Sequence, residues 1–112
     1  MQLSIKTQQH ASVAAVSGDI THAVSAEFQS TLLAALQKSP ALVLDCSGVN
    51  MLTSAGLRAL LLLHREASAS GRRLALTAVP PAVRDVMEVT GFWDQFLTFP
   101  SVDEAVAATT AS

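Results

Sequence analysis

The sequence predicts an α/β protein built on a largely parallel sheet, and three observations support that class. Short apolar runs typical of strands alternate with longer segments whose apolar residues recur at helical spacing, in the order β-β-α-β-α-β-α-β-α. The connections between these segments are short, so none resembles a linker between domains. The chain has 112 residues, 50% of them hydrophobic and 14% charged, which suits one hydrophobic core. We therefore expect residues 1–112 to form a single domain.

The first third of the chain predicts two strands and a helix. Residues 3–6 alternate apolar and polar side chains, which is typical of a half-buried strand. Residues 13–16 form a second apolar run, which a Ser-Gly-Asp turn signal at residues 17–19 ends. From residue 24 to residue 36 apolar side chains recur every four positions, which indicates one buried face of a helix. Pro40 follows the expected end of that helix, because proline cannot extend it.

The middle of the chain predicts a buried strand, a loop and a long helix. Residues 41–44 are all apolar, a run too short for a helix and typical of a buried parallel strand. We expect residues 45–50 to form a loop and a helix to run from about Ser54 to Ser70. Gly71 stands where helices commonly end with a left-handed residue. Because apolar side chains surround most of this helix, it is either buried on several sides or docked against a partner.

The last third of the chain predicts a strand, a helix, a strand and a short helix. Residues 74–77 form the first of these strands, and a Pro-Pro pair at residues 80–81 opens the helix, since proline is tolerated in a first turn. Residues 96–99 form the second strand. Residues 101–104 resemble a capping box that begins the final helix. We expect residues 109–112 to fray.

Composition and charge exclude several classes of function. Seven Lys and Arg against nine Asp and Glu give a net charge of −2 without a basic stripe, so we expect no nucleic-acid partner. The longest strictly apolar run, residues 59–63, is far too short to span a bilayer, and the N-terminus lacks the apolar centre of a signal peptide. The lone Cys46 cannot form an internal disulfide. We therefore expect a cytoplasmic protein with no direct membrane insertion.

The common patterns of catalytic and ligand-binding residues are absent from the sequence. The three histidines lack the spacing of metal ligands, and there is no Gly-x-Ser-x-Gly elbow, phosphate-binding loop or dinucleotide fingerprint. Cys46 is best interpreted as a small packed thiol. Phe92 and Trp93 are interpreted as core anchors, with Phe92 alternatively part of a contact surface. We expect no metal, no cofactor and no enzymatic activity, which leaves a binding module.

Residues 52–57, Leu-Thr-Ser-Ala-Gly-Leu, are the best candidate for a functional site. They join a predicted strand to the longest helix, at the carboxyl edge where open α/β sheets bind ligands and partners. Thr53 or Ser54 can serve as the N-cap, because its oxygen can accept an unpaired helix N–H. Gly56 allows another backbone to approach closely. Taken alone, Ser54 is most simply interpreted as a cap.

Several of these segments together resemble the STAS domains, most closely the bacterial anti-sigma factor antagonists. The resemblance is carried first by residues 42–49 (Leu-Val-Leu-Asp-Cys-Ser-Gly-Val), 52–57 and 63–65. It extends over nearly the whole chain, through residues 17–20, 71–74, 79–83, 89–92 and 99–105. It implies the STAS fold, a mixed and mostly parallel sheet of four to five strands with about four helices packed chiefly on one face.

The resemblance also implies a function. Members of this family bind an anti-sigma factor that is also a GHKL-type serine kinase, and so release the sigma factor. The kinase phosphorylates a serine in an Asp-Ser-Ser/Thr-Gly motif, which breaks the complex, and a phosphatase reverses this. On this chain the phosphoacceptor falls on Ser54, the motif's aspartate on Thr53, its third residue on Ala55 and its glycine on Gly56. Thr53 is a less favoured acceptor, and Thr21 replaces the aspartate of an early turn.

The partner-binding surface that the resemblance implies combines the early turn with the start of the long helix. It comprises Thr21, His22, Thr53, Ser54, Ala55, Gly56, Leu57 and Arg58, although Leu57 alternatively points into the core. A second function also fits a STAS domain. The chain would then be a subunit of a phospholipid-transport ABC complex and would bind its ATPase without phosphorylation.

Overall fold

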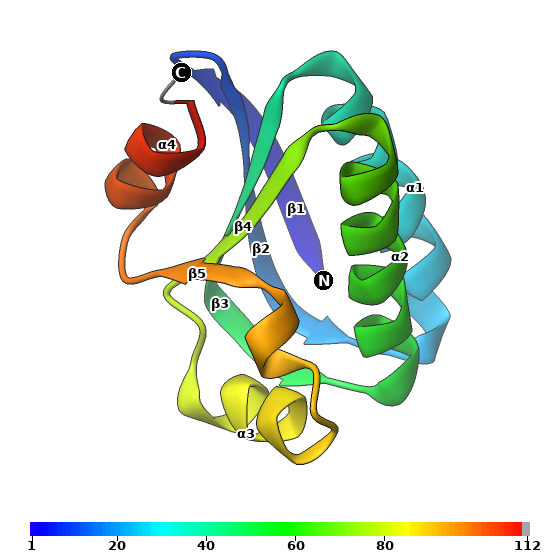
Figure 1. Ribbon diagram of the computed structural model, residues 1–112. Helices are drawn as coiled ribbons and strands as arrows, with labels where there is room; N and C mark the ends of the chain where they lie inside the picture. Colours follow the sequence, from blue (N-terminus) through cyan, green and yellow to red (C-terminus); the bar gives the residue numbers. More distant parts are fainter. Residues whose placement is uncertain (111–112) are drawn as a thin grey trace.

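A five-stranded sheet with the strand order β1-β2-β3-β4-β5 lies at the centre of the computed structural model, which describes residues 1–110 (Figure 1). Strand β1 (Gln2–Gln8) pairs antiparallel with β2 (Ala11–Ile20). Strands β3 (Ala41–Leu52), β4 (Arg73–Thr77) and β5 (Leu97–Phe99) then add in parallel. The predicted mixed and mostly parallel sheet is therefore confirmed.

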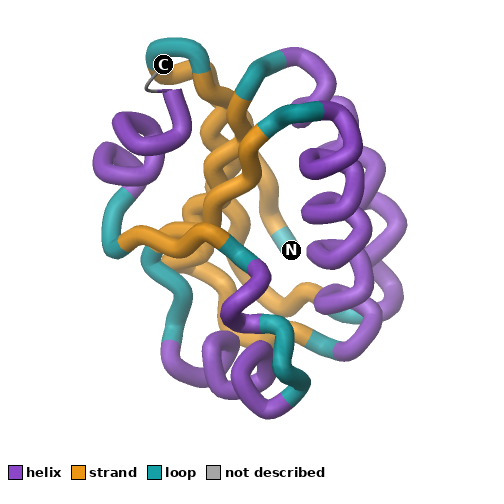
Figure 2. The backbone as a smooth tube through the Cα atoms, viewed as in Figure 1, coloured by secondary structure: helices purple, strands orange, loops and turns teal. Residues whose placement is uncertain are grey.

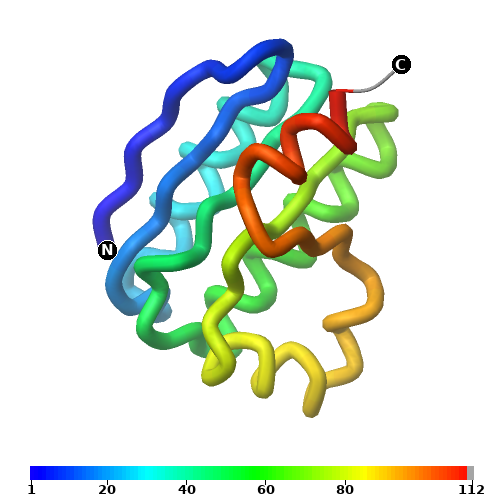
Figure 3. The backbone as a smooth tube through the Cα atoms, turned by 90° about the vertical axis from the view of Figure 1, so that its left-hand side faces the viewer, coloured from blue at the N-terminus to red at the C-terminus, as the bar shows by residue number. Residues whose placement is uncertain are grey.

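Helices cover the two faces of the sheet unequally. Helices α1 (His22–Lys38) and α2 (Ser54–Ser70) lie side by side on one face and cover a large hydrophobic core (Figures 1 and 2). Helix α3 (Pro81–Val89) packs against one end of that core. Helix α4 (Val102–Thr110) packs on the opposite face and lies in front of the sheet in Figure 3. A short 3-10 turn, η1 (Trp93–Gln95), precedes β5. The expected packing chiefly on one face is confirmed.

Burial on both faces explains the continuous apolar run at residues 41–44. Leu42 and Leu44 point into the large core under α1 and α2, whereas Ala41 and Val43 point into the smaller core under α4. Because successive strand residues face opposite sides, a strand covered on both sides has no polar position. Phe92 is half-buried against the large core, as its predicted role as a core anchor requires.

Three predictions about element boundaries are wrong. The Ser-Gly-Asp segment at residues 17–19 is not a turn that ends the second strand, because β2 runs on to Ile20 and stays paired with β3. Residues 45–50 do not form a loop but continue β3, which pairs with β2 as far as Ile20 opposite Leu52. This part of β3 carries exposed polar residues, so its composition resembles that of a loop. At the C-terminus, fraying does not begin at Thr109, which is buried and donates its Oγ1 hydrogen to the carbonyl of Ala105 at 2.7 Å. Residues 111–112 of the expected frayed tail lie outside the described residues.

The ends of the helices form as predicted. Gly71 adopts φ 69°, and its N–H meets the carbonyls of Ala67 and Ser68, which ends α2. Pro81 opens α3. The N–H of Glu104 donates to Ser101 Oγ at 3.3 Å, which is one half of the predicted capping box. Within residues 1–110, no helix combines the length and the apolar character needed to cross a membrane.

Cys46 lies in the large core, and its burial decides its chemistry. Burial raises the pKa of the thiol from its ordinary value of 9.0 to about 12, the charge of Asp45 adds to the rise, and the backbone of Thr77 partly offsets it. The thiol is therefore protonated at neutral pH and is a packing group, as the sequence indicated.

This raised pKa predicts a loss of stability at alkaline pH. Between pH 9 and about 12 the unfolded chain releases the thiol proton while the folded chain keeps it, so the free energy of unfolding falls as pH rises. The slope from this group is up to about 1.4 kcal/mol per pH unit. Denaturant titrations of the wild type and of Cys46→Ala from pH 7 to pH 11 measure it, because only the wild type carries this contribution. Equal slopes in the two proteins, or rapid labelling of the native thiol at pH 8, would contradict the prediction.

Candidate partner-binding site

The start of α2 is held against the end of β2 by hydrogen bonds to a single carbonyl. Strands β2 and β3 end together at Ile20 and Leu52, so the first residues of α1 and α2 emerge side by side. The carbonyl of Ile20 accepts from the backbone N–H of Thr53 at 3.1 Å and from Thr53 Oγ1 at 2.9 Å. The structure thus brings the early turn and the helix start together, as the sequence predicted.

Thr53 is the N-cap of α2. Its Oγ1 accepts the N–H of Gly56 at 3.3 Å while donating to Ile20, so the hydroxyl is used in both directions. An aspartate could accept the same N–H but could not donate to a carbonyl when ionised. Thr53 therefore caps α2 and also bonds to β2. A phosphate on Thr53 would remove the hydroxyl hydrogen that the Ile20 carbonyl accepts, which makes Thr53 a less favourable phosphorylation site than the exposed Ser54.

Ser54, in contrast, is exposed at the first position of α2. The first N–H groups of a helix have no partner within the helix, and the helix dipole makes this end partly positive. A dianionic group on Ser54 would therefore meet a favourable local field. The local field at the start of α2 is therefore compatible with a negative charge on Ser54.

Gly56 and Leu57 are buried beneath the surface that carries Ser54. A Cβ atom at Gly56 would lie 2.8 Å from Ile20 Cγ2, 2.8 Å from Leu52 Cδ1 and 2.9 Å from the Ile20 carbonyl oxygen. Leu57 is only 5% exposed and belongs to the large core. The expectation that these two residues contact a partner is therefore corrected, because neither has a surface to present. The alternative orientation of Leu57, into the core, is the one observed.

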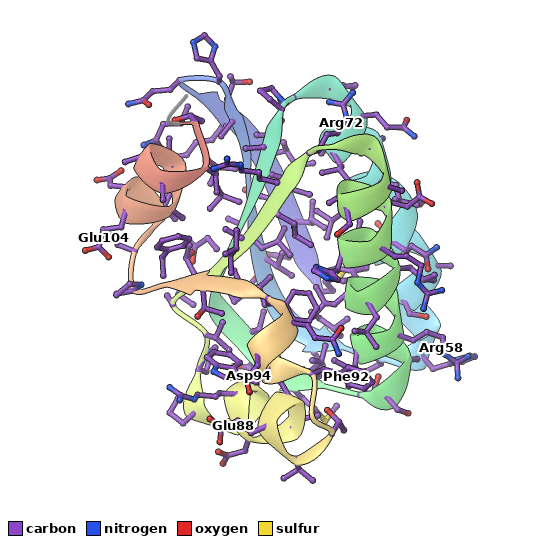
Figure 4. The ribbon with its side chains drawn as sticks, in the orientation of Figure 1. Arg58, Arg72, Glu88, Phe92, Asp94 and Glu104 are labelled. Atoms are coloured by element: carbon purple, nitrogen blue, oxygen red, sulfur yellow. The ribbon has the colours of Figure 1, made fainter. Side chains whose placement is uncertain are left out.

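The remaining predicted residues form a surface around Ser54. His22 and Arg58 are exposed, and Figure 4 shows Arg58 pointing outward from the first turns of α2. Thr21, the N-cap of α1, and Ala55 are half-buried beside them.

Met51, which the sequence analysis did not single out, is an exposed apolar residue close to Ser54 along the chain. It lies in the last residues of β3, three positions before Ser54, and its side chain is 44% exposed. Methionine is adaptable and common where proteins bind one another. The only signal in the sequence was an apolar residue directly before a helix start, inside a segment interpreted as a loop.

The fold and the site together define a small α/β domain with an exposed serine at a helix start. A protein-family model described as "Mlab, STAS domain" matches residues 3–98, and the chain belongs to the STAS domain family. BtrV of Bordetella bronchiseptica, assigned as an anti-sigma factor antagonist, is 31% identical over 97 residues, which cover 86% of this chain and 84% of BtrV.

Solved structures show the same fold. The crystal structure of an anti-sigma factor antagonist from Mycobacterium paratuberculosis has a TM-score of 0.87 and 27% identity, covering 98% of this chain and 94% of that one. The unphosphorylated form of the antagonist SpoIIAA, from Bacillus, has a TM-score of 0.80 over 96% of this chain and 95% of its own. At 17% identity, SpoIIAA supports the fold alone.

Proposed function

We propose that this protein is an anti-sigma factor antagonist that acts in the bacterial cytoplasm. Its unphosphorylated form binds an anti-sigma factor with serine kinase activity through the surface around Ser54. Phosphorylation of Ser54 breaks the complex, and a phosphatase restores binding. The observation that carries the proposal is the exposure of Ser54 at the first position of α2, in a chain whose relatives include anti-sigma factor antagonists. The chain itself is a regulator and not an enzyme.

The switch follows from charge at one position. A phosphate adds about −1.5 to −2 charges and three acceptor oxygens. The free N–H groups of α2 can hold that charge in the unbound protein, but a close-packed interface would have to bury it or open around it. The modification therefore acts on affinity and needs no rearrangement of the fold.

A second candidate function rests on membership of the STAS domain family. A STAS domain also fits the role of a subunit in a phospholipid-transport ABC complex. In that role the same helix start would bind an ATPase constitutively. The two functions differ in the partner and in the need for a phosphate.

Mass spectrometry of the protein from its native host separates these functions. We expect the intact mass to show one phosphate in part of the population, and peptide mapping of residues 42–65 to place it on Ser54. We expect a GHKL-type kinase to copurify with the unphosphorylated fraction. A phosphate on Thr53 would keep the switch and move its acceptor. A copurifying ABC ATPase with no phosphate under any growth condition would overturn the proposal in favour of the second candidate.

A further inference from the structure

One stripe of α2 continues from Ser54 along the outer side of the helix. Ser54, Arg58, Leu61, Arg65 and Ser68 are spaced by four, three, four and three residues, so their side chains lie on one face. Four of them are exposed and Leu61 is half-buried. The surface that carries Ser54 is therefore the end of a longer face, about 20 Å from Ser54 to Ser68 at 1.5 Å per residue.

Beside this stripe lies a groove of about 320 Å³ between α2 and the segment that leads into β5. The α2 side contributes Leu61, His64, Arg65 and Ser68, and the opposite side contributes Phe92 and Gln95. Leu61 and Phe92 are half-buried and pack against the large core, so both are held in place. Figure 4 shows Phe92 between α3 and the lower part of α2. The groove thus has a fixed apolar floor that still reaches the surface.

The outer stripe of α2 carries two arginines in a chain that is negative overall, while the exposed carboxylates Glu66 and Asp94 stand next to the groove-lining residues Arg65 and Gln95. The chain carries a net charge of −2, yet the stripe contains Arg58 and Arg65 and starts at the positive end of the α2 dipole. The residues that line the groove include Arg65 and no carboxylate. The two arginines are seven positions apart, about 10 Å along the helix, with Leu61 between them. An apolar centre flanked by two cations suits a helix that carries apolar residues on one side and carboxylates beside them.

We propose that this groove binds an acidic amphipathic helix of the anti-sigma factor, docked along α2 from Ser54 to Ser68. The inference rests on the proposed function and names the partner element that the site binds. Apolar side chains of that helix fill the groove over Leu61 and Phe92, and its carboxylates face Arg58 and Arg65. A phosphate on Ser54 stands one turn from Arg58, so it neutralises that arginine and repels the carboxylates. Phosphorylation of Ser54, at one end of the stripe, thereby weakens the binding of the docked helix.

Isothermal titration calorimetry with the kinase that copurifies with the wild type tests this. Arg65→Glu reverses a charge at an exposed position and is expected to weaken binding at least tenfold. Phe92→Ala, which removes the opposite wall, is expected to weaken it similarly. Lys38→Glu is the matched control, because Lys38 is exposed in the last turn of α1 and does not line the groove, and we expect less than a twofold change. Circular dichroism confirms that each variant is folded.

The possible results separate this inference from the proposed function. If Ser54→Asp weakens binding while Arg65→Glu and Phe92→Ala do not, the switch holds and the docked helix is wrong. If Arg65→Glu and Lys38→Glu weaken binding equally, the attraction is general charge and the groove has no specific role, which overturns the inference. If no kinase copurifies, the proposed function fails, and an ABC ATPase captured in its place is titrated against the same variants. If the ATPase then binds Arg65→Glu more weakly than the wild type but binds Lys38→Glu equally well, the groove binds the ATPase. That result would overturn the inference that the groove binds an acidic helix of an anti-sigma factor.

Discussion

Ser54→Asp is expected to weaken binding to the anti-sigma factor by more than a hundredfold while leaving the fold intact. A fixed carboxylate at the first position of α2 stays favourable in the free protein, because the helix dipole and the free N–H groups stabilise it. In the complex the same charge must be buried or left without its water. A net penalty of about 3 kcal/mol corresponds to a loss of affinity of more than a hundredfold. Calorimetric titration measures the affinity, and thermal unfolding measures the stability.

The control for Ser54→Asp is a second helix-start serine on the other side of the molecule. Ser101 is exposed directly before α4, and its Oγ accepts the N–H of Glu104, so Ser101→Asp introduces the same charge at another helix start. Helix α4 covers the opposite face of the sheet, and we expect Ser101→Asp to bind like the wild type. Ser54→Ala should also bind within a few-fold, because it adds no charge. Equal affinity of Ser54→Asp and the wild type would remove the basis of the switch.

The parts of the fold that the sequence predicted are those with a strong hydrophobic period. The stripe of α1 and the apolar run of β3 at residues 41–44 are dictated by burial, and burial is what the structure shows. The second half of β3 could not be predicted, because its side chains show no such hydrophobic period. Its residues pair with β2 through the backbone, and backbone hydrogen bonds leave no mark on side-chain polarity.

The candidate site was only partly readable from the sequence. The resemblance selected Ser54 as the phosphoacceptor, and the structure places this residue, exposed, at the start of α2. The rotation of α2 could not be predicted, because apolar side chains surround most of the helix and only packing against α1 and the sheet selects the buried ones. Leu57 therefore proved to be core and Leu61 to be half-exposed. The double use of the Thr53 hydroxyl was equally hidden, since its second partner, Ile20, is 33 positions away.

Gly56→Ala is expected to destabilise the protein by about 2 kcal/mol, although alanine is the better helix former by about 1 kcal/mol. The added methyl would lie 2.9 Å from the carbonyl oxygen of Ile20, which Thr53 already holds with two hydrogen bonds. A backbone atom fixed in this way cannot turn aside as the end of a side chain can. The start of α2 must move away from β2, which weakens the cap at Thr53. Denaturant unfolding measures the loss, which corresponds to roughly 10 °C in melting temperature.

Gly71→Ala separates this steric effect from the ordinary cost of replacing a glycine. A Cβ at Gly71 meets nothing within 4 Å, so its cost comes only from the left-handed φ of 69°, about 1 kcal/mol. Gly71 also lies at the far end of α2 from Ser54, so its replacement should leave partner binding unchanged. Gly56→Ala should lower both stability and affinity, because the contact that excludes the methyl also positions Ser54. A Gly56→Ala protein more stable than the wild type would show that helix propensity outweighs the contact with Ile20, and that the site tolerates a looser α2 start than its geometry implies.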